Sequence, residues 1–167
     1  MDILEHTFLI RKLPPYFANV GKRLVKSPKV YFRDTGLLHH FLGIQSPGAL
    51  DTHPARGASW EAFVIDHLAS AFQRAAPGSQ PYFWRTAQGD EVDCLIDRGT
   101  RRVPFEVKLH SSPTAEDAQG LRRCMRDLDL PHGYIIYPGR ERYSLGQGVI
   151  ALPAEPLLAR PESVRGL

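Results

Sequence analysis

Charged and apolar side chains alternate in two stretches of this chain, Glu91-Val92-Asp93-Cys94-Leu95-Ile96 and Phe105-Glu106-Val107-Lys108-Leu109. Successive side chains of a strand point to opposite faces, so each stretch predicts a strand with one apolar and one charged face. The short connection is typical of a hairpin of neighbouring strands. The expected apolar faces hold Val92, Cys94 and Ile96, then Phe105, Val107 and Leu109. The expected charged faces hold Glu91 and Asp93, then Glu106 and Lys108.

A helix is predicted over residues 59–74, ahead of these strands. Its apolar residues recur at helical spacing, and they are Trp60, Phe63, Val64, Leu68, Ala71 and Phe72. Glu61 falls inside this apolar stripe, whereas Asp66 is expected to point outward into solvent. A carboxylate aimed at a core is costly unless it is paired. Glu61 therefore either has a partner near the sheet or lies at the edge of the stripe and reaches solvent.

Further elements are expected on both sides of the hairpin. The predicted strands cover residues 82–85, 134–137 and 149–152, and a second helix covers residues 114–128. Thr114 and Asp117 have the spacing of a capping box at the start of that helix. The order helix, three strands, helix, strands predicts a mixed sheet flanked by helices, in an α/β domain.

Residues 1–50 differ from the rest and are predicted to be the end of an incomplete domain. Two strands are expected there, over residues 8–13 and 30–33, with a helical turn over residues 37–42. Such a segment has too little apolar material to bury a core of its own. Residues 51–167 then form the α/β domain, and the Pro- and Gly-containing residues 45–57 are expected to be the linker.

The composition is that of an ordinary globular protein with a mildly basic balance. Of the 167 residues, 43% are hydrophobic, and the formal net charge is +3 with a pI near 9.0. Basic residues gather in one stretch and are Lys22, Arg23, Lys26, Lys29 and Arg33. This permits a nucleic-acid partner without requiring one. No apolar run approaches the roughly 20 residues of a membrane span, and no signal peptide or P-loop is found, so a cytoplasmic protein is expected.

The charged faces of the helix and the two strands predict a site for a divalent metal. Hydrolysis of a phosphodiester uses such a metal to polarise the phosphate and acidify a water molecule. Magnesium, or manganese in its place, prefers oxygen ligands, which the Asp93 and Glu106 carboxylates and the Val107 carbonyl can supply. Lys108 is expected beside the metal, where its ammonium orients the attacking water or offsets charge on the phosphate. Glu61 is expected to act through a water molecule.

This order of residues resembles the PD-(D/E)XK nuclease superfamily. The resemblance rests on Glu61 on a first helix, Asp93 on a strand, and Glu106-x-Lys108 on the next strand. It implies a restriction-endonuclease-like sheet in which Glu61, Asp93, Glu106 and Lys108 form the catalytic site. The signature proline of the superfamily is absent, and Val92 stands in its place.

A closer resemblance covers nearly the whole chain. The segments that carry it are residues 27–38 (SPKVYFRDTGLL), 57–64 (GASWEAFV), 82–86 (YFWRT), 91–93 (EVD) and 105–108 (FEVK). They are similar to a domain of unknown function found C-terminal to the P-loop ATPase module of many bacterial and archaeal AAA-type ATPases. The resemblance implies an upstream ATPase module. It also implies that residues 1–50 are the end of a winged helix whose wing contains the basic stretch.

Two functions stay open at this point. The first is a magnesium-dependent nuclease module that acts on DNA and is driven by an ATPase. The second is a non-catalytic module that binds DNA or protein and regulates that ATPase. The charged strand faces fit both, because Glu106 and Lys108 can also form a simple salt bridge. The oligomeric state is not predicted.

Overall fold

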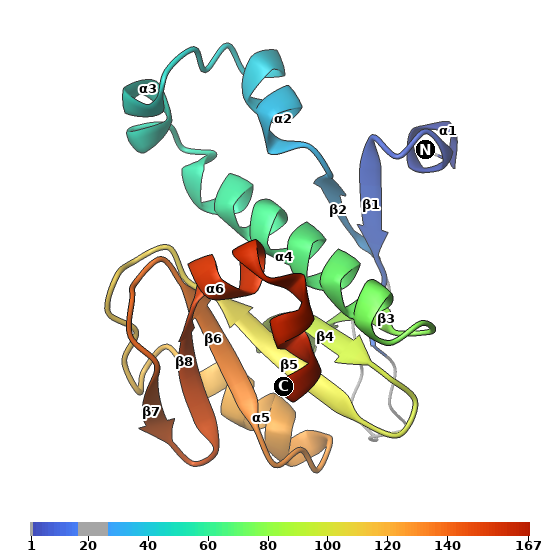
Figure 1. Ribbon diagram of the computed structural model, residues 1–167, viewed down its shortest axis with the longest axis vertical. Coiled ribbons are helices and arrows are strands. Elements are labelled where there is room, and N and C mark those ends of the chain that lie inside the picture. Colours follow the sequence, from blue (N-terminus) through green and yellow to red (C-terminus); the bar gives the residue numbers. More distant parts are fainter. Residues whose placement is uncertain (1, 17–26) are drawn as a thin grey trace.

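A six-stranded mixed sheet lies at the centre of the molecule (Figure 1). The computed structural model describes residues 2–16 and 27–167. The strands of this sheet are β3 (Gln80–Arg85), β4 (Glu91–Asp97), β5 (Arg102–Val107), β6 (Gly133–Tyr137), β7 (Tyr143–Gly146) and β8 (Val149–Pro153). Their order across the sheet is β3-β4-β5-β6-β8-β7. The predicted mixed sheet flanked by helices is confirmed, whereas β7 was not predicted.

The sheet changes from antiparallel to parallel pairing at its centre. β3, β4 and β5 form an antiparallel meander, whereas β5 pairs with β6 and β6 with β8 in parallel. β7 returns antiparallel to β8 at the far edge. Parallel neighbours need a crossover connection, and α5 (Gln119–Asp127) supplies it between β5 and β6.

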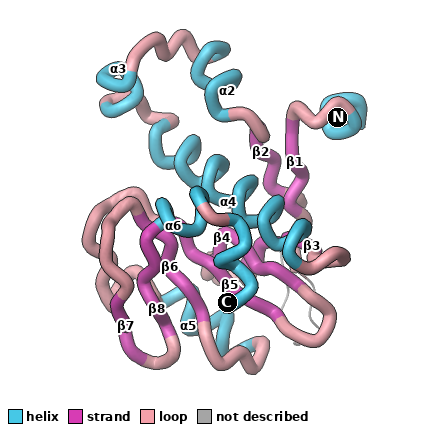
Figure 2. The backbone as a smooth tube through the Cα atoms, viewed as in Figure 1, coloured by secondary structure: helices cyan, strands magenta, loops and turns pink. Residues whose placement is uncertain are grey.

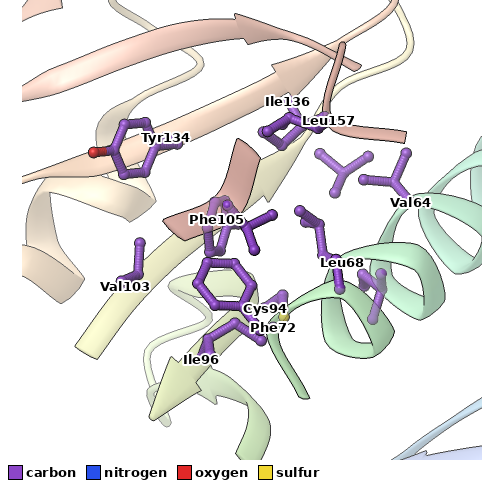
Figure 3. Close-up of a cluster of buried hydrophobic side chains, with 14 of the residues drawn as sticks. Val64, Leu68, Phe72, Cys94, Ile96, Val103, Phe105, Tyr134, Ile136 and Leu157 are labelled. Atoms are coloured by element: carbon purple, nitrogen blue, oxygen red, sulfur yellow. The ribbon is translucent and has the colours of Figure 1, made fainter. Parts of the chain in front are cut away.

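Helices cover both faces of the sheet. One face carries α4 (Arg56–Ala75), together with α6 (Ala154–Ala159) and the 3-10 helix η1 (Pro161–Gly166), and α5 lies on the other face (Figure 1). The core under α4 includes Val64, Leu68, Phe72, Cys94, Ile96, Val103, Phe105, Tyr134, Ile136 and Leu157 (Figure 3). The core under α5 includes Trp84, Val92, Leu95, Leu121, Cys124 and Ile135.

A bulge in β4 corrects the predicted alternation of this strand. Tyr82 pairs with Leu95 and Trp84 with Val92, so Asp93 and Cys94 together lie opposite the single residue Phe83. An extra residue of this kind shifts the alternation of side chains along a strand. Val92 consequently packs under α5, whereas Cys94 and Ile96 pack under α4, and the expectation that all three share one face was wrong.

The second helix begins later than its capping pattern predicted. The Asp117 carboxylate does accept hydrogen bonds from the backbone N–H of Thr114 at 2.7 Å and from its hydroxyl at 3.2 Å. These bonds close a turn over residues 115–118, and the regular helix α5 starts only at Gln119. The side-chain pair therefore formed as expected, but it precedes the helix.

The N-terminal residues form a small hairpin that docks on the main sheet. β1 (Ile10–Leu13) and β2 (Lys29–Phe32) pair antiparallel, preceded by α1 (Asp2–His6). After β1 the chain runs beside β3, where the carbonyl of Pro14 accepts from Phe83 N at 3.0 Å. Leu13 is fully buried in the core under α4. The winged-helix interpretation stays a prediction, and Lys22, Arg23 and Lys26 of the basic stretch lie outside the described residues.

Two short helices connect the hairpin to α4. They are α2 (Thr35–Phe41) and α3 (Pro47–Asp51), and they lead away from the sheet before the chain returns to α4 (Figure 2). α3 occupies the predicted linker because the Ser46 side chain caps it and Pro47 fits its first turn. None of the helices in residues 2–16 and 27–167 has both the length and the apolar composition that crossing a membrane requires. The cytoplasmic location stays a prediction.

Candidate functional site

The site lies where β4 and β5 separate. Their pairing runs from Asp97 opposite Arg102 to Cys94 opposite Phe105. Beyond this last pair, Oδ2 of Asp93 accepts a hydrogen bond from the backbone N–H of Val107 at 2.9 Å. The bulge directs the Asp93 side chain to this position, where only 9% of the residue is exposed. The Asp93 carboxylate thus takes the place of a backbone carbonyl as the hydrogen-bond acceptor for Val107, just beyond the last β4–β5 pair.

Glu106 and Lys108 lie on the two sides of Val107. The Lys108 ammonium donates to Oε1 of Glu106 at 2.9 Å, whereas the buried Oε2 of Glu106 has no hydrogen-bond partner among residues 2–16 and 27–167. A buried carboxylate oxygen without a partner is costly, and a cation is one way to satisfy it. From α4, the Trp60 indole N–H donates to the carbonyl of Lys108 at 3.0 Å and so fixes the end of the strand.

An open hollow of about 510 Å³ lies beside Glu106 and Lys108. Glu91 of β4 and Gly120 and Arg123 of α5 also line it. A Cβ at Gly120 would lie 2.7 Å from the carbonyl oxygen of Glu91, so the missing side chain lets α5 approach β4 closely. The hollow therefore depends on a close contact between α5 and the strand that carries Asp93.

Glu61 is held by the N-terminal hairpin. Its Oε1 accepts a hydrogen bond from the Tyr31 hydroxyl at 2.6 Å and one from the Lys29 ammonium at 3.1 Å. Its side chain is 28% exposed, so it lies at the edge of the core and has partners there. Glu61 does not line the hollow beside Glu106 and Lys108. Burial and the Glu61 carboxylate raise the pKa of Tyr31 above its usual value.

Lys29 joins Glu61 to two acidic residues of β4, Glu91 and Asp93. Its ammonium lies 3.5 Å from Oδ1 of Asp93 and also forms an ion pair with Glu91. Burial opposes the charged form of Lys29, but Asp93, Glu61 and Glu91 outweigh it and raise the pKa of Lys29 above its usual value. Burial likewise opposes the charged form of Glu91, but Lys29 and Arg85 lower its pKa.

The pKa values of the Asp93 and Glu106 carboxyl groups are both raised above their usual values. Burial, followed by the charge of Glu61, raises the pKa of Asp93, although Lys29 and the Val107 N–H act in the opposite direction. Burial, followed by the charge of Asp93, raises the pKa of Glu106, although Lys108 acts in the opposite direction. Two buried carboxylates near one another resist simultaneous ionisation. A divalent cation would relieve this repulsion.

The predicted site residues are brought together in two linked groups. Glu61 and Asp93 share the Lys29 ammonium, and Glu106 and Lys108 form an ion pair. The hydrogen bond from Val107 to Asp93 links the groups. Among residues 2–16 and 27–167, no set of three or more His, Cys, Asp or Glu side chains is arranged to hold a metal ion. The predicted metal ligands are only two side-chain carboxylates, those of Asp93 and Glu106, and one backbone carbonyl. Oε2 of Glu106, which has no hydrogen-bond partner in the described part of the chain, is consistent with this smaller ligand set.

Several contacts at the site were not predicted from the sequence. The sequence indicates Lys29 only as part of a basic stretch, whereas in the structure it faces carboxylates of α4 and β4. Its spacing from Tyr31, two positions along a strand, places both side chains on one face and was the available clue. The outward direction expected for Asp66 was wrong, because Asp66 is 14% exposed and binds Arg11 and Arg33 of the hairpin segment.

The chain matches protein families whose function is not described. Residues 56–157, more than half of the chain, match the domain of unknown function DUF4143, and residues 1–48 match the domain of unknown function DUF8612. The uncharacterized proteins Mb2031c of Mycobacterium bovis and Rv2008c of Mycobacterium tuberculosis are each 42% identical over 158 residues. These matches cover 95% of the chain but only 34% of either relative. No solved structure matches significantly. The chain belongs to the family of the domain of unknown function DUF4143.

Proposed function

We propose that this chain carries a PD-(D/E)XK nuclease-like site that hydrolyses phosphodiester bonds of DNA with Mg²⁺ or Mn²⁺. One observation carries the proposal: the partnerless, buried Oε2 of Glu106 lies in a site where Asp93 is held on the neighbouring N–H of Val107. Both carboxyl groups are buried and have a raised pKa, so the ammonium groups of Lys29 and Lys108 do not fully offset the cost of ionising them. A divalent cation would supply further positive charge.

Asp93, Glu106 and the carbonyl of Val107 would hold the metal. When bound, it would polarise a phosphate oxygen and lower the pKa of a water molecule. The residues of this chain have separate tasks. Lys108 is held by Glu106, and its ammonium can orient the water or offset charge on the phosphate. Glu61 is fixed by Tyr31 and Lys29 at the other side of Asp93, where its carboxylate can hold a water molecule.

DNA is the proposed substrate because two cations lie in the hollow beside the carboxylates that line it, which are those of Asp90, Glu91, Glu106, Glu116 and Asp117. Lys108 and Arg123 line it, and the side chain of Arg123 is 49% exposed although it pairs with Asp90. The formal net charge of +3 supports the same class of ligand. Arg122 of the same helix is engaged with the carbonyls of Ala115 and Leu145, so it contributes less to such a surface.

The chain spans about a third of the length of the relatives that it matches, namely 34%. We propose that it is a module of a longer protein whose upstream part is a P-loop ATPase. In that arrangement, ATP hydrolysis would control when DNA reaches the site, and the winged-helix segment would contribute to DNA binding.

A cleavage assay tests this function. The chain is incubated with plasmid DNA and with fluorescently labelled linear DNA, with Mg²⁺, with Mn²⁺ or with a chelator. We expect cleavage that needs the metal and is lost in Asp93→Asn and Lys108→Met. Lys12→Met is the control, because Lys12 pairs with Glu5 on the hairpin segment. Cleavage that persists equally in Asp93→Asn would rule out the assigned site.

A second function, a non-catalytic module that regulates the ATPase, is favoured by one observation. Lys29 already forms ion pairs with Glu61, Glu91 and Asp93, as in a purely structural ion-pair network. In that case the chain binds DNA or protein but does not cleave DNA with Mg²⁺ or with Mn²⁺. DNA binding by Asp93→Asn and wild type that is equal and metal-independent would support this reading over the first.

A further inference from the structure

The Lys29 ammonium occupies the centre of an acidic cluster made by two other elements. Glu61 of α4 lies 3.1 Å away, Asp93 of β4 lies 3.5 Å away, and Glu91 of β4 forms an ion pair with it. The Lys29 side chain is only 18% exposed. Three carboxylates therefore share one cation in a partly buried ion-pair network. Here the cation belongs to the chain and comes from the N-terminal hairpin.

We propose that Lys29 is a built-in competitor of the divalent metal, and that its ammonium must leave Asp93 when the metal binds. This inference rests on the proposed function, because it concerns the same metal site. Oδ2 of Asp93 is engaged by the Val107 N–H, so Oδ1 is the oxygen that faces a cation. Lys29 faces that same oxygen. Two cations that share one carboxylate oxygen repel each other strongly in a partly buried site.

Lys29 can leave without disrupting the hairpin. Its four-carbon side chain is flexible, and β2 has other attachments to α4. Tyr31 holds Glu61 at 2.6 Å, and Arg33 holds Asp66 at 3.1 Å. The hairpin thereby sets the metal affinity of a site whose proposed ligands lie on β4 and β5. The contact of Lys29 with Oδ1 of Asp93 is therefore an autoinhibitory one within this proposal.

Manganese binding to the full chain tests the competition. Free Mn²⁺ is measured by electron paramagnetic resonance for wild type, for Lys29→Met and for the control Lys12→Met. We expect Lys29→Met to bind Mn²⁺ at least about tenfold more tightly than wild type, which corresponds to about 1.4 kcal/mol. Lys12→Met should match wild type. Equal affinities in wild type and Lys29→Met would overturn the inference and leave the proposed metal site in place.

Chemical labelling of the wild-type chain gives an independent readout, which also decides the matter if Lys29→Met does not fold. Lysine acetylation by an activated ester is followed by mass spectrometry with and without Mn²⁺. We expect acetylation of Lys29 to rise with Mn²⁺, because its ammonium leaves the carboxylates, while acetylation of Lys12 stays constant. If Mn²⁺ binds and Lys29 stays protected, the inference is wrong. If neither wild type nor Lys29→Met binds Mn²⁺, the proposed function itself fails.

Discussion

The Asp93 carboxylate accepts a hydrogen bond from the backbone N–H of Val107 at 2.9 Å, at the point where the β4–β5 ladder ends. This bond holds an acidic side chain on the backbone N–H of Val107, the residue that Glu106 and Lys108 flank in the sequence. It also makes Asp93 part of the fold as well as part of the proposed site. Substitutions at Asp93 therefore separate the effect of charge from that of hydrogen bonding.

Replacing Asp93 tests the structural role of this bond. Asp93→Asn keeps an oxygen that can accept from Val107 and should change the free energy of unfolding little, because it also removes a charge that repels Glu61 and Glu106. Asp93→Ala leaves the Val107 N–H without its acceptor and should destabilise the fold by about 1–3 kcal/mol. Urea denaturation of both variants without metal measures the difference. Equal stability of the two variants would contradict the assigned bond.

The stability of the metal-free chain should fall as pH rises from about 5 to about 8. In the folded chain burial raises the pKa of Asp93 from 3.8 to about 6 and that of Glu106 from 4.5 to about 8. Between the unfolded and folded pKa values the folded state binds more protons, so unfolding becomes easier as pH rises. The total effect is on the order of a few kcal/mol. Melting temperatures across this range should decline more steeply for wild type than for Glu106→Gln, and parallel curves would refute the assignment to Glu106.

Asp66 should be a major attachment of the N-terminal hairpin. Its Oδ1 accepts from Arg11 at 2.7 Å and from Arg33 at 3.1 Å, and its side chain is 14% exposed. Asp66→Ala should destabilise the chain by about 2 kcal/mol, the scale of buried hydrogen bonds to charged groups. The matched control is Asp51→Ala, whose pair with Arg56 is 3.5 Å long and exposed. It should cost at most about 0.5 kcal/mol, and an equal loss in both variants would contradict this account.

Gly120 should be required for the contact between α5 and β4. A Cβ there would lie 2.7 Å from the carbonyl oxygen of Glu91, so Gly120→Ala must push the helix away from the strand. We expect a loss of about 1–3 kcal/mol, together with weaker binding of Mn²⁺ at the proposed site of Asp93 and Glu106. Gly57→Ala in α4 is the control, because no atom of the described residues outside its chain neighbours and the adjacent helix backbone lies within 4 Å of its added Cβ. It should leave stability unchanged or raise it by up to about 1 kcal/mol, as expected for Gly to Ala in a helix.

Hydrophobic patterns in the sequence predicted most helices and strands of the fold, but they did not predict contacts between elements that are distant in the sequence. The helical spacing of Val64, Leu68 and Phe72 correctly predicted the face of α4 that covers the sheet. The bulge at Asp93 was not predictable, because it depends on how β4 pairs with Phe83 of β3.

The site shows the same division between local and tertiary information. The alternation in β5 correctly placed Glu106 and Lys108 together, and their ion pair is 2.9 Å long. The positions of Glu61 and Asp66 depend on how the hairpin docks on α4, and hydrophobic periodicity contains no information about an ionic partner. Lys29 was missed as a member of the acidic cluster for that reason.

Direct measurement of Mn²⁺ binding tests the central claim, that Asp93 and Glu106 share one divalent cation. Electron paramagnetic resonance titrations of wild type and Asp93→Asn are compared at pH 8 and pH 6. We predict one Mn²⁺ per wild-type chain, displaced by Mg²⁺. Its affinity should be higher at pH 8, where the carboxyl groups with raised pKa values lose their protons more readily. Asp93→Asn should lose this binding. Titrations of wild type and Asp93→Asn that coincide at both pH values would contradict the claim.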